Sequence, residues 1–279
     1  MEQKRLVSIQ DLSCFGKCSL SVALPVISSA GIETVVLPTA ILSTHTGEFK
    51  EYSFHSLSRQ FKEISSHWKK LNIKFDAIYV GYIGSMELVD FVSEFIDEFR
   101  SENTVVFIDP AMADNGKFYS GLGFEYAEKL SILCQKADFI SPNLTEAIIM
   151  TGFERPYESF DSKDTEIIIK KLSDICPNPI ITGIHSKDLI STASYKKDSN
   201  EFFINNYPIK KGTFYGSGDL FASSFMGYYL NGTPFTESVK KASFFVNDCI
   251  ENSMDEREKY WYGLKFEQSL HLLHTKNRM

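Results

Sequence analysis

The sequence predicts an α/β fold with an open, mainly parallel sheet and helices on both faces. Three observations lead to this prediction. Short apolar runs of strand length alternate with longer runs of helical spacing through about residue 184. From Leu189 to Ile209 the period changes to two around a Lys-Lys-Asp-Ser-Asn turn, which predicts an antiparallel hairpin. No linker, low-complexity segment or internal repeat divides the chain, so we expect a single domain over residues 1–279.

The expected parallel strands are short apolar runs that stop at a polar residue, glycine or proline. They cover residues 6–9, 33–37, 76–80, 104–108, 137–140 and 179–182. We expect Pro38 to end the second strand and a polar loop to follow the first strand at Gln10. The segment from Ala113 to Tyr119 is rich in turn formers and predicts a loop.

The expected helices have apolar residues three and four positions apart. They cover about residues 19–30, 58–71, 88–99, 124–135, 144–151 and 165–175, then a helix that ends at Asn231, one around residues 239–250 and one over residues 264–273. Pro25 predicts a kink or an early break in the first of them. Gly31 and Gly152 are expected at helix C-termini.

Composition limits the classes of function. Of the 279 residues, 43% are hydrophobic and 23% charged, which is ordinary for a globular protein. The net charge of −7 argues against nucleic-acid binding, which needs a basic face. No run approaches the roughly 18 apolar residues of a membrane span, and the N-terminus lacks an apolar signal region. Five scattered cysteines fit reduced thiols, so we expect a cytoplasmic protein.

The tetrad Gly216-Ser217-Gly218-Asp219 precedes an apolar run that begins at Leu220. This pattern predicts a loop that leads into a helix, whose unpaired first-turn N–H groups and dipole attract an anion. Asp219 would lie at the edge of that anion site, where a carboxylate can accept a proton from a substrate hydroxyl. The alternative is a Gly-Ser turn with Asp219 as a helix cap, and the tetrad alone leaves both open.

Polar residues follow most of the expected parallel strands. In open α/β sheets, ligands bind at the carboxyl ends of the strands. The residues expected at that edge are Gln10, Asp11, Thr46, Tyr82, Asp109, Asn143, Glu146 and Thr182. Each has a structural alternative, such as a turn former for Asp109 or a helix cap for Asn143. Their common position at one edge favours a ligand site.

These residue types are typical of phosphoryl transfer, which needs positioning and charge neutralisation more than covalent help. The amides of Gly216 to Gly218 would supply donors, Asp219 the base, and Asp109 with Glu146 an acidic pair for Mg²⁺, directly or through water. A Walker A motif is absent, because Gly116-Lys117 lacks both the upstream glycine and the following Ser or Thr. An ATP enzyme with this sequence would bind phosphate in another way.

The sequence resembles the ribokinase-like superfamily and, within it, the pyridoxal and pyridoxamine kinases. The resemblance spans about residues 6–226. It is carried by Ser8-Ile9-Gln10, Pro38-Thr39, Ser43-Thr44-His45-Thr46-Gly47, Gly81-Tyr82, the segments 109–114 and 141–147, and the tetrad with Leu220-Phe221-Ala222. The tetrad is typical of the superfamily, whereas the His-Thr-Gly loop and the early Gln indicate the vitamin B6 branch.

The resemblance implies ATP-dependent phosphorylation of the 5′-hydroxymethyl group of a B6 vitamer: pyridoxal, pyridoxine or pyridoxamine. It implies that Asp219 is the catalytic base and that the amides of Gly216, Ser217 and Gly218 form an anion hole. For the other groups it implies Mg²⁺ at Asp109 and Glu146, ATP near Asp114, Asn143, Thr182 and Ser217, and the vitamer ring near Gln10, Asp11, His45, Thr46 and Tyr82. Residues 114–119 would form a flap. It also implies a homodimer and leaves open a monovalent cation such as K⁺.

Two positions depart from the family pattern. Ser217 stands where many members have Thr and keeps the hydroxyl, so we expect activity to survive. Asp11 stands where the pyridoxal kinases have Ser, and a carboxylate beside a pyridine would favour a protonated amine or ring nitrogen, hence pyridoxamine. Two alternatives stay open: a kinase for hydroxymethylpyrimidine on the same fold, and a non-catalytic B6 or nucleotide sensor.

Overall fold

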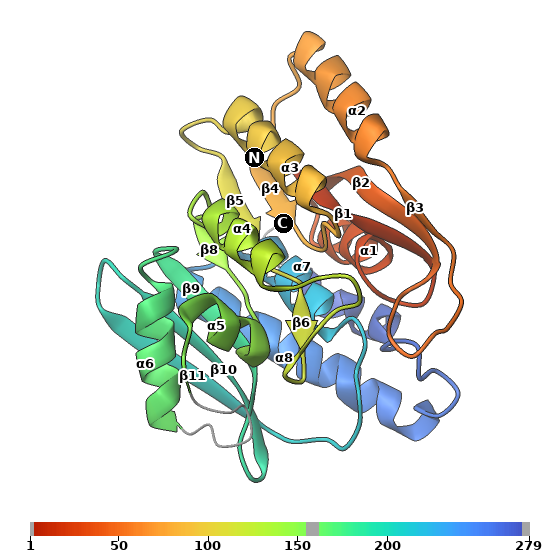
Figure 1. Cartoon of the computed structure of the whole chain (residues 1–279). Helices are drawn as coiled ribbons and strands as arrows, with labels where there is room; N and C mark the ends of the chain where they lie inside the picture. Colours follow the sequence, from red (N-terminus) through yellow and green to blue (C-terminus); the bar gives the residue numbers. More distant parts are fainter. Residues whose placement is uncertain (1–2, 155–161, 275–279) are drawn as a thin grey trace.

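The computed structural model describes residues 3–154 and 162–274. Nine strands form one sheet in the order β11-β10-β9-β8-β5-β4-β1-β2-β3 (Figure 1). The neighbours from β2 to β9 pair in parallel: β2 (Glu33–Thr44), β1 (Arg5–Phe15), β4 (Ala77–Val80), β5 (Val105–Ile108), β8 (Phe139–Ile140) and β9 (Asn178–His185). The edge strands are antiparallel: β3 (Phe54–Ser56) on one side, β10 (Leu189–Lys196) and β11 (Glu201–Pro208) on the other. The predicted fold class and hairpin are confirmed.

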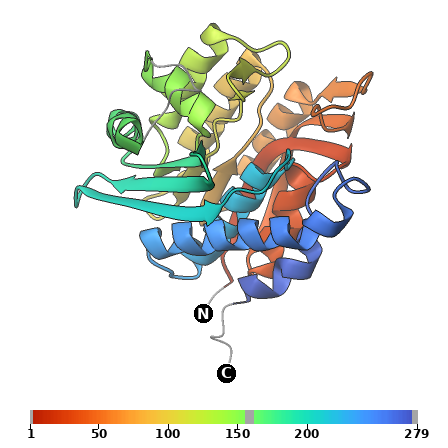
Figure 2. The ribbon, with the colours of Figure 1, turned by 90° about the horizontal axis from the view of Figure 1, so that it is seen from below.

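Helices cover both faces of the sheet, as Figure 2 shows from below. One face carries α2 (Ser58–Lys70), α3 (Met86–Phe99), α4 (Phe124–Cys134), α5 (Leu144–Thr151) and α6 (Ser162–Leu172). The other carries α1 (Leu20–Ser29), α7 (Ser217–Leu230), α8 (Phe235–Ser253) and the 3₁₀ segment η3 (Phe266–Leu273). Among the described residues, no helix has the length and apolar character needed to cross a membrane.

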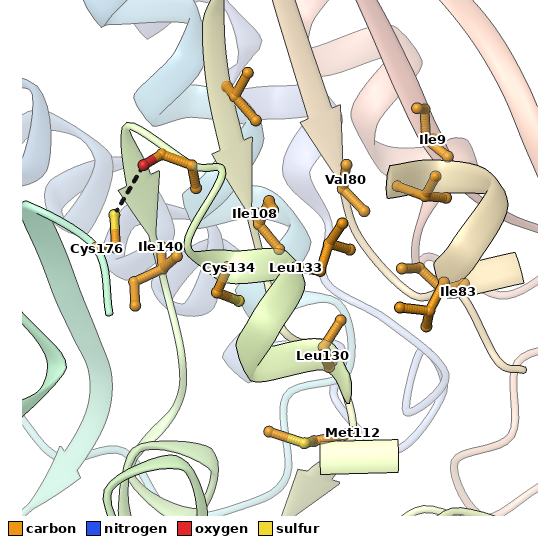
Figure 3. Packing of buried hydrophobic residues seen from close by; sticks show 14 of the residues in the cluster. Ile9, Val80, Ile83, Ile108, Met112, Leu130, Leu133, Cys134, Ile140 and Cys176 are labelled. Carbon is orange, nitrogen blue, oxygen red and sulfur yellow. Dashed lines mark hydrogen bonds between the residues drawn. The ribbon is translucent and has the colours of Figure 1, made fainter. Parts of the chain in front are cut away.

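The two layers of side chains explain why the strands read as uninterrupted apolar runs. All four residues of β4 are buried, because helices cover both faces of the sheet. Figure 3 shows the layer under α4, where Ile9, Val80 and Ile108 from neighbouring strands lie close to Leu130 and Leu133. At its edge the Cys176 thiol donates a 3.4 Å hydrogen bond to the Ala137 carbonyl. This packed core gives the sheet edge above it a fixed geometry.

Two strands are longer than the sequence suggested, and both reach the site. β1 continues past Gln10 to Phe15, and β2 continues past Pro38 to Thr44, so the expectation that these residues end their strands was wrong. Pro38 pairs with Gln10 where the register between the strands shifts. A proline has no N–H for the ladder, and such an irregularity is where a strand tolerates one. The extensions carry Asp11 and bring His45 to the end of β2.

Smaller differences lie at segment ends. The expected loop at residues 113–119 contains a two-stranded hairpin, β6 (Ala113–Asp114) with β7 (Lys117–Phe118). β9 runs three residues beyond Thr182, and β3 was not predicted. α1 continues past Pro25 without a break, and the last predicted helix is the 3₁₀ segment η3, preceded by η2 (Met254–Glu256). These segments are short, and such departures occur where local sequence signals are weakest.

Candidate active site

A cavity of about 490 Å³ lies at the carboxyl ends of the parallel strands, beside the N-terminus of α7. It brings together all but one of the residues predicted for the site. Those that line it are Asp11, His45, Thr46, Tyr82, Asp109, Asp114, Asn143, Glu146, Thr182 and Gly216 to Asp219. These residues come from segments spread over more than two hundred positions, and the sheet edge assembles them as predicted for α/β proteins.

Gln10 is the predicted residue that does not line the cavity. Its side chain is fully buried, donates to the Ser8 hydroxyl at 2.7 Å and lies directly against Gly81. Asp11 is the next residue, at the register shift between β1 and β2, and its side chain lines the cavity.

Gly216 is the N-cap of α7 and has a left-handed backbone, with φ of 78°. A methyl group at this position would lie 2.0 Å from the Lys17 carbonyl oxygen, so the turn needs glycine for both conformation and space. The Ser217 N–H donates to the Phe214 carbonyl at 3.3 Å, a long bond that a better acceptor can displace. With Gly218 exposed toward the cavity, the start of α7 is suited to an anion.

Asp219 lies in the first turn of α7, and one of its oxygens (Oδ2) accepts the Ser19 backbone N–H at 2.8 Å. Burial raises the pKa of Asp219 to about 7, the Ser19 hydrogen bond lowers it, and the charge of Asp11 raises it. A carboxylate with this pKa is a good proton acceptor near neutral pH. The arrangement places a candidate general base next to a candidate anion site.

Asp109 and Glu146 form an acidic pair near Asp219, with Glu146 buried and Asp109 partly exposed to the cavity. Burial and the charges of Glu146 and Asp219 raise the pKa of Asp109 well above its usual range. Burial raises the pKa of Glu146 to about 8, even though three backbone N–H groups donate to its oxygens. These donors belong to Met112, Ala113 and Asn143, at 3.0, 3.3 and 2.8 Å. A cation at this site would relieve the repulsion among the carboxylates.

Asn143 and Glu146 also have a structural role. The Asn143 side chain accepts the Glu146 N–H at 3.0 Å, and the Glu146 carboxylate accepts the Asn143 N–H, so the two residues form a capping box at the start of α5. Asn143 Nδ2 donates to the Ala113 carbonyl at 2.7 Å. The helix-cap alternative for Asn143 is confirmed, and its side chain still lines the cavity.

The charge of the cavity wall indicates what it can bind. Among the described residues that line it are five carboxyl groups (Asp11, Asp109, Asp114, Glu146 and Asp219) and one lysine, Lys210. When these carboxyl groups are ionised, they repel a polyphosphate unless a cation accompanies it. Within the described ranges no three His, Cys, Asp or Glu side chains are grouped to hold a metal by themselves. Mg²⁺ commonly binds through one or two carboxylates, water and substrate phosphates, so Asp109 and Glu146 fit that ion.

Part of the cavity wall is aromatic. His45 Nδ1 accepts the Gly47 N–H at 3.1 Å, which places the ring proton on Nε2, where it donates to the Tyr262 carbonyl at 2.9 Å. Burial lowers the pKa of His45, consistent with a neutral ring. Burial together with Asp11 and Tyr52 raises the pKa of Tyr82 to about 12, so its phenol keeps its proton. These groups offer neutral donors and ring faces to a small aromatic ligand.

Tyr119, which the sequence analysis placed in the expected flap, follows β7 and lines the cavity close to the carboxylates of Glu146, Asp114 and Asp109. The sequence analysis missed Val246, Asn247 and Ile250 of α8, which also line the cavity. Val246 and Ile250 read as core positions in the helical pattern, and only the polar Asn247 beside them signalled another role.

Comparisons with known proteins identify relatives in sequence and in fold. Residues 23–261 match the model of a family described as phosphomethylpyrimidine kinase. A candidate phosphomethylpyrimidine kinase from Bacteroides thetaiotaomicron, crystallised with pyridoxal, is 31% identical, with a TM-score of 0.92 over 100% of this chain and 98% of that chain. A pyridoxal kinase from Lactobacillus plantarum is 26% identical, with a TM-score of 0.89 over 98% and 97% of the two chains. The pyridoxal kinase of Dictyostelium discoideum is 22% identical over 96% of this chain and 94% of its own length.

Proposed function

Because this chain belongs to the phosphomethylpyrimidine kinase family, within the ribokinase-like kinases, we propose that it phosphorylates the 5′-hydroxymethyl group of a vitamin B6 vitamer with ATP. The observation that carries the proposal is Asp219, a carboxylate with a pKa of about 7 at the start of α7 in an acidic cavity. Relatives named pyridoxal kinase and the pyridoxal complex of the Bacteroides protein support the vitamer as substrate.

In this reaction the substrate oxygen attacks the γ-phosphorus of ATP, the bond to ADP breaks, and Asp219 takes the hydroxyl proton. The N–H groups of Gly216 to Gly218 face the charge that develops on the transferred phosphoryl group. Asp109 and Glu146 would hold Mg²⁺, which neutralises phosphate charge when bound. Asp114, Asn143, Thr182 and Ser217 would contact ATP, and Asp11, His45, Thr46 and Tyr82 would surround the ring. Gln10, a predicted ring contact, does not line the cavity.

The test of this proposal is ADP formation from Mg-ATP in the presence of pyridoxal, pyridoxine, pyridoxamine or hydroxymethylpyrimidine, one at a time. We expect turnover with at least one vitamer and little with the pyrimidine. Turnover with the pyrimidine alone would assign the protein to thiamine synthesis, which the name of the matching family favours. Binding of a vitamer or nucleotide without ADP formation would identify a sensor.

Asp11 is the residue that we propose sets the preference among vitamers. It is 4% exposed, lines the cavity, accepts the Ser13 hydroxyl at 3.0 Å and has a pKa raised by burial. A buried carboxylate is stabilised by a cationic ligand. Asp11→Ser is therefore expected to lower kcat/KM for pyridoxamine about tenfold relative to pyridoxine. Steady-state kinetics with the three vitamers measure this ratio; the exposed neighbour variant Cys14→Ser is the control, and an unchanged ratio would refute the role.

Four expectations remain. The homodimer and a monovalent cation such as K⁺ beside Mg²⁺ rest on the family resemblance, the cytoplasmic location rests on the scattered cysteines, and the single domain over the whole chain rests on the lack of a linker in the sequence. We retain them as proposals.

A further inference from the structure

We propose that the segment of residues 260–267, which follows the last long helix, positions Asp219 for catalysis, and that Lys17 is the residue through which it acts. The inference rests on the proposed role of Asp219 as the base. Its starting point is the hydrogen bond from the Ser19 N–H to Asp219 Oδ2, at 2.8 Å. Asp11, Asp109, Tyr79 and Cys18 also face this carboxylate, from β1, the end of β5, β4 and the loop after β1.

The Ser19 backbone has an unusual conformation. Its φ is 53°, in the left-handed region that residues other than glycine seldom adopt. Such a conformation is strained and persists when the surroundings impose it. The N–H direction at Ser19, and with it the orientation of Asp219, therefore depends on what holds residues 16–19 in place.

Lys17 is held from two sides at close range. A methyl group on Gly216 would lie 2.0 Å from the Lys17 carbonyl oxygen, and a methyl group on Gly263 would lie 2.4 Å from Lys17 Cβ and 3.1 Å from its backbone nitrogen. The Lys17 backbone thus fits between the N-cap of α7 and the 260–267 segment, with room for glycine only on either side. Movement of this segment toward Lys17 would push the loop that carries Ser19.

Three further contacts fix Lys17 to the 260–267 segment. Its backbone N–H donates to the Tyr262 carbonyl at 3.3 Å, and its ammonium group pairs with Glu267 at 2.8 Å. The same ammonium group lies 5.2 Å from the centre of the Phe266 ring. The Lys17 side chain is 21% exposed and that of Glu267 56%, so the ion pair adds little by itself and the backbone bond and the close packing carry most of the attachment.

The 260–267 segment also holds the ring-binding side of the cavity. The Tyr262 carbonyl that accepts the Lys17 N–H accepts His45 Nε2 as well, at 2.9 Å. The Tyr262 ring packs on Phe15 and the Trp261 ring on Phe49, with centroids 4.7 and 4.5 Å apart. One carbonyl therefore joins the loop that orients the base to the loop that faces the vitamer, so the segment sets the distance between them.

Gly263→Ala and Lys17→Met test this role by steady-state kinetics with the preferred vitamer. We expect Gly263→Ala to lower kcat about tenfold and to leave both KM values within about twofold, because a misplaced base affects the chemical step. A weaker Ser19 bond also raises the pKa of Asp219, so the acid limb of the pH profile should move to higher pH. Lys17→Met keeps an apolar stem over Phe266 but loses the Glu267 pair, and a smaller loss of about threefold is expected.

Two controls separate positioning from stability. Gly232→Ala adds a methyl group in open space at a glycine with φ of 87°, and Lys69→Met breaks an ion pair with Glu98 far from the cavity. Both should lower the melting temperature without moving the acid limb. If Gly263→Ala and Lys17→Met lower the melting temperature but leave kcat and the acid limb unchanged, as the controls should, the inference is wrong. If Gly263→Ala fails to fold, the kinetics of Lys17→Met decide the test. Full activity of Asp219→Asn would instead overturn the proposed base, a separate result.

Discussion

Asp219→Asn is expected to lower kcat with the preferred vitamer about a thousandfold, the contribution of a general base. In the native chain the Ser19 N–H donates to Asp219 Oδ2 at 2.8 Å. The asparagine oxygen can still accept this hydrogen bond, so the side chain keeps its place but cannot take a proton. Because the pKa of Asp219 is about 7, wild-type kcat/KM should decline below that pH. The residual activity of the variant should lack this decline. Kinetics from about pH 5 to about pH 9 measure both effects.

The same variant has a prediction for stability that needs no substrate. Folding raises the pKa of Asp219 from 3.8 to about 7, so the folded chain holds this proton more tightly than the unfolded chain. The stability from this group is fully present below about pH 4 and is lost as the pH rises to about 7, at most about 4 kcal/mol at 1.36 kcal/mol per pKa unit. Asparagine does not titrate, so the variant lacks this pH dependence. The free energy of unfolding of Asp219→Asn should therefore exceed that of the wild type by more at pH 8 than at pH 5. An equal difference at both pH values would contradict the raised pKa.

The parts of the molecule that could be predicted from the sequence depend on local signals. The apolar run of β4 identified a buried strand. The turn formers after β5 identified the edge of the sheet where that strand ends. Asn143 was weighed as a helix cap before the expected helix at residues 144–151, and it is the N-cap of α5. Parallel strands end at a common edge, so the positions of Asp109 and Tyr82 in the site followed from their strands.

The parts that could not be predicted depend on contacts between distant segments. Ser19 and Asp219 are 200 residues apart, and His45 and the Tyr262 carbonyl 217 apart. No local pattern indicates such pairs. The length of β1 and β2 was missed for a related reason: Pro38 is a strand breaker by propensity, and only its pairing with Gln10 at a register shift makes it tolerable. The need for glycine at position 263 likewise comes from a distant contact, because a side chain there would collide with Lys17.

Glu146→Ala is expected to lower the free energy of unfolding by about 3 kcal/mol, because three buried backbone N–H groups lose their acceptor. The capping box of α5 is lost with them. Burial also makes Glu146 costly to ionise, with a pKa of about 8, and removal of that carboxyl offsets part of the loss. Urea unfolding at neutral pH, followed by tryptophan fluorescence, measures the difference.

The control for this prediction is Glu125→Ala. Glu125 is an exposed acidic residue in the first turn of α4, where no capping box forms, and its removal should cost no more than about 0.5 kcal/mol. The loss of unfolding free energy in Glu146→Gln should lie between those of Glu125→Ala and Glu146→Ala, because the amide oxygen can still accept the N–H groups of Met112 and Ala113. Those two residues connect the Asp109 turn to the β6–β7 hairpin, so loss of their anchor should also reduce activity. A cost below about 1 kcal/mol for Glu146→Ala would mean that water replaces the carboxylate as acceptor and that Glu146 is dispensable for the fold.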